Sequence, residues 1–132
     1  MNPIYLCFNI RPFPKERPRF TKKGYSYTPK KTRAFENYIA VNAKKQLVEN
    51  GIYKPTQKLL SVKVFFFFKK PKKTILEIPK PDLDNLLKSL FDSLNKLVYV
   101  DDTQIRLIYA IKNWSTQDQI VVTFNEAINT ED

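Results

Sequence analysis

The chain has 132 residues, enough for one domain with a real core, and 42% of them are hydrophobic. With no histidine and one cysteine, Cys7, it cannot form a Ser-His-Asp triad, a Cys-His pair, a His-metal-finger nuclease site or a four-cysteine zinc site. The net charge of +10 favours nucleic acid or an anionic membrane as partner, although a lysine-rich soluble surface gives the same number.

The sequence carries no signal for export or membrane insertion. Residues 1–10 lack a basic start followed by a long apolar segment. The longest uninterrupted apolar run is Val64 to Phe68, far short of the roughly 20 residues that span a bilayer. A lone cysteine fits a reducing compartment. We therefore expect a cytoplasmic protein without a membrane partner.

The first half of the chain predicts a strand, an irregular basic segment and a helix. Residues 4–10 alternate loosely between apolar and polar and predict the first strand. Residues 11–28 hold three prolines among bases and aromatics, which predicts a loop or an irregular hairpin. Thr28 is typical of an N-cap and Pro29 of a first helical position, so a helix is expected from there to a stop at Gly51.

The second half predicts a strong strand, a second helix and two more strands. Residues 59–68 end in four phenylalanines, and a strand apolar on both faces is either covered on both sides or part of an interface. From Leu83 to Leu97 the apolar residues fall within one arc of about 140°, which predicts an amphipathic helix. A short apolar link at 98–100 follows, and residues 105–112 and 120–124 read as strands joined by a turn.

These elements predict one α+β domain over residues 1–132, with two main helices packed on a small mixed sheet. We expect a basic arm at 11–33 and a C-terminal tail at 127–132. The basic residues gather in two loop-like segments, 11–33 and 69–80, which favours a polyanionic partner over a uniformly basic surface. The candidate DNA-binding residues are Arg11, Lys15, Arg17, Arg19, Lys22, Lys23, Lys30, Lys31, Lys69, Lys70, Lys72 and Lys73.

The acids are concentrated in residues 82–102, which hold five of the thirteen. Asp82 and Asp84 flank one apolar residue at the start of the predicted helix, and in extended geometry residues two apart point to the same side. Asp102, with Asp101 as a possible contributor, supplies a third carboxylate if the next strand returns beside the helix start. Hard cations such as Mg²⁺ take one or two carboxylates plus substrate phosphate.

This arrangement predicts a site for phosphodiester hydrolysis, with Lys88 one helical turn after Asp84 and able to stabilise negative charge. Each residue also has a structural interpretation. Either aspartate at the helix start can act as a cap, Asp84 and Lys88 can form an ordinary surface pair, and residues 101–103 can form a polar turn. Asp92, two turns beyond Asp84, is expected to face solvent.

Several segments together resemble the RusA family of Holliday junction resolvases. They are Asp-Leu-Asp-Asn-Leu-x-Lys at 82–88, Phe-Asp-x-Leu at 91–94 and Asp-Asp-x-Gln-Ile at 101–105. Arg-Pro-Arg-Phe at 17–20 and Tyr-Thr-Pro-Lys-Lys-Thr at 27–32 also resemble the N-terminal part of phage-type members. The likeness runs from about residue 10 to residue 110.

The resemblance implies a homodimeric endonuclease that depends on Mg²⁺, with Mn²⁺ as a substitute, and that resolves four-way DNA junctions by paired nicks. It implies no organic cofactor, and branched DNA as the partner. Asp82, Asp84 and Asp102 match the family's essential carboxylates, Lys88 matches its catalytic lysine, and Asp101 matches an acid of lesser role. The arm at 11–33 varies in such proteins, so its DNA contacts are not transferred.

Two other functions stay open at this point. A non-catalytic nucleic-acid-binding module would use Phe20, Tyr25 and Tyr27, set among bases, to stack on unpaired bases. Its difficulty is the acidic residues, which repel phosphate unless a cation intervenes. A nuclease of the PD-(D/E)xK type is suggested by Pro81-Asp82, but the required acid-x-Lys tripeptide does not follow.

Overall fold

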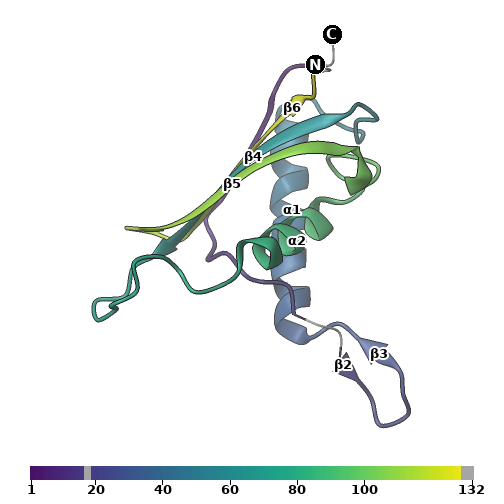
Figure 1. Cartoon of the computed structure of the whole chain (residues 1–132). Helices are drawn as coiled ribbons and strands as arrows, with labels where there is room; N and C mark the ends of the chain where they lie inside the picture. The colour runs from purple at the N-terminus through teal and green to yellow at the C-terminus, as the bar shows by residue number, and fades with distance from the viewer. Residues whose placement is uncertain (17–18, 129–132) are drawn as a thin grey trace.

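The computed structural model describes residues 1–16 and 19–128, with the side chain of Arg19 left out. Two helices and a four-stranded sheet form the body, and a two-stranded hairpin projects from it (Figure 1). In chain order the elements are β1 Ile4–Phe8, β2 Arg19–Phe20, β3 Ser26–Tyr27, α1 Lys30–Glu49, β4 Leu60–Lys69, α2 Leu83–Leu94, the short 3₁₀ turn η1 Asp102–Gln104, β5 Ile105–Ser115 and β6 Gln119–Glu126.

The main sheet is mixed, with strand order β1-β6-β4-β5. β4 pairs with β5 in parallel, whereas β6 pairs with both β4 and β1 in the antiparallel sense. The parallel pair requires a crossover, and α2 lies in that connection. The predicted α+β fold with two helices on a small mixed sheet is thereby confirmed. No helix in the described ranges is long and apolar enough to cross a membrane.

The phenylalanine run alternates between two different environments. Val64, Phe66 and Phe68 are at most 1% exposed and belong to the core between sheet and helices. Phe65 and Phe67 are only half-buried and stack on each other on the opposite face. Both helices of the described chain lie on one side of the sheet, and neither covers the other face (Figure 1). Of the two expectations for this strand, coverage on both sides is wrong for the described chain, because only one face belongs to the core, and a place at an interface stays a prediction.

α1 begins one residue later than predicted and ends where predicted. Pro29 occupies the N-cap with extended backbone and without a side-chain cap bond, so Thr28 is not the cap. At the other end the amide of Gly51 donates to Val48 O and the amide of Ile52 donates to Leu47 O. This is the hydrogen-bond pattern of a Schellman motif, and Gly51 adopts the left-handed conformation that it requires, with φ of 75°.

The basic segment before α1 forms the irregular hairpin that the sequence allowed. β2 and β3 pair over two residues each, and Gly24, with φ of 87°, lies in the turn between them. α2 is shorter than predicted: the apolar pattern continues to Leu97, but the helix ends at Leu94. Lys96 is left-handed, with φ of 67°, and its amide donates to Tyr99 O. This local turn leads the chain away from the helix axis.

Candidate active site

Asp82 and Asp84 lie together at the first turn of α2. Asp82 is the N-cap residue with extended backbone, and its side chain makes no cap hydrogen bond. Asp84 Oδ1 accepts a hydrogen bond from the amide of its neighbour Asn85 at 2.8 Å. Both carboxylates are exposed, and neither has a salt bridge within the described part of the chain. The positive end of the helix dipole favours their negative charge, so two free carboxylates face solvent at one helix start.

Lys88 points along the helix to Asp92 rather than back to Asp84. Its Nζ lies 3.7 Å from Asp92 Oδ1, and the lysine side chain is 63% exposed. Asp92 is half-buried and also pairs with Lys15, at 3.3 Å from Nζ to Oδ2. The expectation that Asp92 faces solvent is therefore wrong, because its side chain is only 28% exposed and contacts two lysines. The spacing of Lys88 and Asp92, four residues apart, was the signal available in the sequence.

Lys15 ties the basic arm to both helices. Its Nζ donates to Glu36 Oε1 of α1 at 2.8 Å, and its backbone amide donates to Asn85 O in the first turn of α2 at 3.0 Å. Partial burial alone would lower the pKa of Lys15, but the hydrogen bonds and charges of Glu36 and then Asp92 outweigh it and raise the pKa. The ammonium group therefore stays charged and holds residues 11–16 beside the start of α2.

Asp101 and Asp102 lie beyond the other end of α2, in a tightly hydrogen-bonded turn. Gln104 Oε1 accepts the amides of Val100 and Asp101 at 2.8 and 3.0 Å, while Thr103 Oγ1 donates to Asp101 Oδ2 at 3.1 Å. Asp101 is thus part of a polar turn, which was the structural alternative to a metal-binding role. Asp102 is exposed, and no hydrogen bond or ion pair of its side chain is found among the described residues.

Tyr99 connects this turn to the last part of α2. Its hydroxyl donates to Phe91 O at 2.6 Å, and the side chain is fully buried. Burial, followed by the charges of Asp102, Asp92 and Asp101, raises the pKa of Tyr99 far above its ordinary value. The phenol therefore remains neutral and acts as a hydrogen-bond donor. Of the three carboxylates, Asp92 is in the last part of α2, and Asp101 and Asp102 are in the turn before β5.

The structure does not bring Asp82, Asp84 and Asp102 together within one chain. Because β4 and β5 are parallel, the loop after β4 and the turn before β5 lie at opposite ends of these two strands. Lys112 Nζ donates to Pro81 O at 2.6 Å, so the start of α2 lies beside Lys112. At about 3.3 Å per residue, Lys112 is about 23 Å along β5 from Ile105, the residue that follows the turn. Among the described residues no three acids are close enough to hold one metal ion.

The donor chemistry at the start of α2 nevertheless fits a hard cation. Asp82 and Asp84 offer oxygen ligands that no cation of the described chain neutralises, and Mg²⁺ commonly binds through one or two carboxylates, waters and substrate phosphate. Asp102 has the same free carboxylate but lies elsewhere. The assignment of all three as ligands of one ion stays a prediction.

The predicted DNA-binding residues fall into three groups. Arg11 and Lys15 have intramolecular partners, since Arg11 donates to Asp118 Oδ1 at 3.0 Å and stands over the ring of Phe68. Arg17 lies outside the described residues, and of Arg19 only the backbone is described. The others are exposed, and their side chains have no ion-pair partner in the described ranges: Lys22, Lys23, Lys30, Lys31, Lys69, Lys70, Lys72 and Lys73.

Both exposed basic segments connect to the start of α2. The loop at 70–81 leads directly into Asp82, and the hairpin β2–β3 follows the segment that Lys15 anchors to Asn85. Phe20, Tyr25 and Tyr27 on this hairpin are 70, 71 and 46% exposed. Such exposure of three aromatic rings is unusual for a monomer surface and is suited to stacking on bases.

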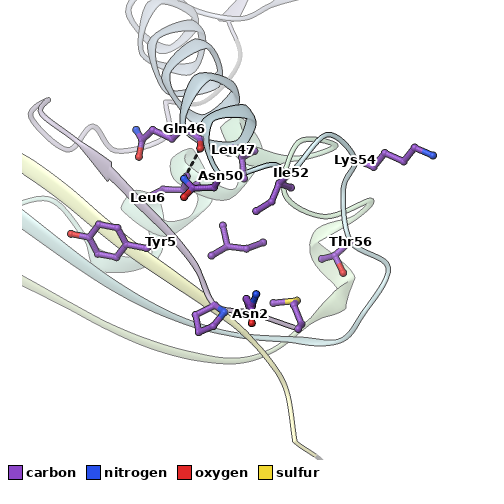
Figure 2. Close-up of a pocket in the computed structure, with 12 residues that line it drawn as sticks. Asn2, Tyr5, Leu6, Gln46, Leu47, Asn50, Ile52, Lys54 and Thr56 are labelled. Carbon is purple, nitrogen blue, oxygen red and sulfur yellow. Dashed lines mark hydrogen bonds between the residues drawn. The ribbon is translucent and has the colours of Figure 1, made fainter.

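A cavity of about 530 Å³ lies elsewhere, between β1 and the C-terminal end of α1. Figure 2 shows it lined by Tyr5 and Leu6 on one side and by Gln46 and Asn50 on the other. Asn50 Nδ2 donates to Gln46 O at 2.7 Å, which fixes this part of its wall. None of the predicted catalytic residues lines the cavity, so it is separate from the carboxylates at the start of α2.

Comparison with known proteins covers nearly the whole chain. The sequence profile of the family described as Endodeoxyribonuclease RusA matches residues 9–125. A curated relative described as uncharacterized protein YqaN, from Bacillus subtilis (strain 168), is 28% identical over 128 residues, covering 87% of this chain and 90% of that protein. The matched region contains α2, both acidic pairs and the two basic segments. The chain belongs to the RusA endodeoxyribonuclease family.

Proposed function

We propose that the protein is a metal-dependent endonuclease that resolves four-way DNA junctions by paired cuts, acting as a homodimer. The observation that carries the proposal is the pair of carboxylates without ion-pair partners in the described residues, Asp82 and Asp84, at the helix start that the loop at 70–81 enters and that Lys15 of the basic arm contacts through Asn85. Family membership supports the endonuclease activity. A four-armed substrate needs two cuts, which a two-fold symmetric dimer supplies from one gene.

In this proposal Asp82 and Asp84 hold a divalent cation against a DNA phosphate. When bound, the cation lowers the pKa of a water molecule and stabilises the charge of the attacked phosphate. Lys88, exposed and one turn further along, adds positive charge near the same phosphate. Its contact with Asp92 restrains the side chain on this helix face. Asp102 is proposed as a further ligand on the family pattern.

The lysines of the hairpin and of the loop at 69–80 bind the DNA backbone. Lys22 and Lys23 lie in the hairpin turn, and Lys72 and Lys73 lie in the loop, so the DNA reaches the carboxylates between two cationic segments. Each phosphate contact of this kind releases condensed counterions, which makes binding depend strongly on salt. The proposed substrate is branched DNA, and no organic cofactor takes part.

Cleavage of a synthetic four-way junction tests the proposal. The wild-type protein with Mg²⁺ is expected to nick opposing strands in pairs. Asp84→Asn is expected to bind the junction at least as tightly but to lose cutting, because it removes a metal ligand and one repulsive charge. Glu49→Gln removes an equal charge from the exposed end of α1 and serves as the control. Normal cutting by Asp84→Asn would show that Asp84 is not a required metal ligand, and the proposed site would be wrong.

The exposed aromatic rings of the hairpin support a second candidate, a non-catalytic module that stacks on unpaired bases. This candidate predicts binding that is independent of Mg²⁺ and indifferent to Asp84→Asn. It also predicts a junction that stays intact under all metal conditions. The same two proteins and the same junction therefore separate the two functions.

A further inference from the structure

The loop at 70–81 holds an aliphatic side chain entirely in solvent. Ile75 is 99% exposed, the largest fraction among the large hydrophobic residues of the described chain. A fully exposed isoleucine adds nothing to the core and forgoes the stabilisation that burial of such a side chain gives. Leu76 and Ile78 beside it are 47 and 52% exposed. Three exposed aliphatic residues within four positions indicate a surface that contacts a partner outside the fold.

The loop is bonded at both of its legs to the end of β5. Lys70 N donates to Ser115 O at 3.0 Å, and Trp114 Nε1 donates to Leu76 O at 3.0 Å. Trp114 in turn packs against the core. Figure 1 shows the loop, in teal, projecting from the end of β4 before the chain returns to α2. The loop tip, residues 71–75, is therefore presented to solvent from a fixed base.

The loop tip is set among positive charges. Lys72 and Lys73 form its turn, Lys69 and Lys70 lie just before it, and all four are exposed. From residue 69 to residue 80 the chain has five lysines and a single acid, Glu77. An exposed aliphatic side chain among lysines is complementary to an anionic partner that also offers an apolar surface. DNA offers both, because its phosphates surround a stack of bases.

The place of the loop in the fold favours DNA over an anionic lipid surface, which also combines negative charge with an apolar interior. The loop leads directly into Asp82 at the start of α2. Its last residue, Pro81, is held there by Lys112, whose Nζ donates to Pro81 O at 2.6 Å. The loop tip and the candidate metal ligands therefore belong to one continuous segment, and a polymer with phosphates along its length can contact both.

We propose that Ile75 is a wedge that inserts between bases at the branch point of a DNA junction and so determines the preference for branched over linear DNA. Apolar side chains that accompany basic residues separate base steps in this way in minor-groove-binding proteins. Separation costs least where a base has already lost part of its stacking or pairing, as at a branch point. The lysines contact phosphates in either kind of DNA, whereas Ile75 gains contacts only where bases separate.

This inference rests on DNA being the substrate in the proposed function, but on neither the metal nor the cutting step. The test therefore measures binding without metal. Ile75→Ser removes the aliphatic group and keeps every charge. It is expected to weaken junction binding at least about tenfold, the effect of losing one buried aliphatic side chain. Its affinity for a linear duplex of the same arm sequence and its salt slope are expected to stay unchanged, because the phosphate contacts are the same.

Two matched variants control for the loss of an exposed aliphatic residue. Ile75→Leu keeps an aliphatic side chain at the loop tip and is expected to bind the junction as the wild type does. Ile128→Ser removes an isoleucine that is 80% exposed after the end of β6, and it is expected to change neither affinity. All three substitutions lie outside the core, and circular dichroism spectra like that of the wild type verify their folding.

A fluorescent base reports the insertion itself. The base analogue 2-aminopurine is quenched in a stack and brightens when it is unstacked. Placed at the branch point, it is expected to brighten with the wild type and with Ile75→Leu, but not with Ile75→Ser. Vesicles of phosphatidylserine and phosphatidylcholine, offered without DNA, are expected to bind the wild type and Ile75→Ser equally.

The outcomes separate the wedge from the proposed function. Unchanged junction binding by Ile75→Ser, an equal loss of junction and duplex binding, or vesicle binding that depends on Ile75 would overturn the wedge. If Mg²⁺-dependent cutting persisted in that case, the proposed function would stand without it. A wild-type protein that bound no junction would overturn both.

Discussion

Replacing Tyr99 by phenylalanine tests how the turn that carries Asp102 is attached to α2. The substitution keeps the buried ring and removes only the hydroxyl, which donates to Phe91 O at 2.6 Å. Losing one buried hydrogen bond and leaving its carbonyl partner less satisfied costs about 1–2 kcal/mol. For 132 residues the entropy of unfolding is about 0.3 kcal/mol per degree, so Tm should fall by about 4–7 °C.

Thermal and urea denaturation of the two proteins measure this directly. Tyr53→Phe is the control, because Tyr53 is 75% exposed and its hydroxyl has no hydrogen-bond partner among the described residues. We expect the control to lie within about 0.5 kcal/mol of the wild type, as surface substitutions do. If Tyr99→Phe were as stable as the control, the hydroxyl would not stabilise the turn, and the reasoning that links Tyr99 to Phe91 would be refuted.

Two further predictions concern the basic segments. Lys15→Gln should lower the free energy of unfolding by about 1 kcal/mol near neutral pH. Because the pKa of Lys15 is raised in the folded state, its contribution to stability is complete below the unfolded pKa of 10.5 and is lost as pH rises through the folded pKa. The difference in unfolding free energy between wild type and variant should therefore narrow at high pH, and a constant difference would contradict the prediction. Replacing Lys72 and Lys73 by glutamine should weaken junction binding and reduce the salt slope by about 1 to 2. Lys54→Gln, just after the C-terminal end of α1, is the control and should leave the salt slope unchanged in the same titration. If Lys54→Gln reduced the slope as much as the loop variant, the DNA would not bind at the loop.

The helices and the core strands could be predicted because their signals are local. The leucine spacing from Leu83 determined the phase of α2, and Gly51 marked the end of α1 because the left-handed position after a helix favours glycine. The early end of α2 could not be predicted in the same way. It depends on a left-handed Lys96 and on the bond from Tyr99 to Phe91, and neither is visible in the spacing of apolar residues.

The sequence predicted which carboxylates form the candidate site, but not how they lie relative to one another. The expectation that the strand after α2 returns beside the helix start assumed an order of strands that the pattern does not contain. β4 and β5 are parallel, so the turn with Asp102 lies at one end of these strands, whereas the loop that leads to Asp82 leaves β4 at the other end. The contacts of Lys15 were missed for a related reason, since its partners Glu36 and Asp92 are distant in sequence and meet only once α1 and α2 pack.

The central claim is that Asp82 and Asp84, at the N-terminal end of α2, hold a divalent cation at the DNA phosphate. Electron paramagnetic resonance of Mn²⁺ measures this most directly, because bound ions leave the free-ion signal. With an uncleaved junction analogue present, the wild-type protein should bind Mn²⁺, and Asp82→Asn and Asp84→Asn should each weaken that binding at least about tenfold. Equal Mn²⁺ binding by the wild type and both variants would contradict the account.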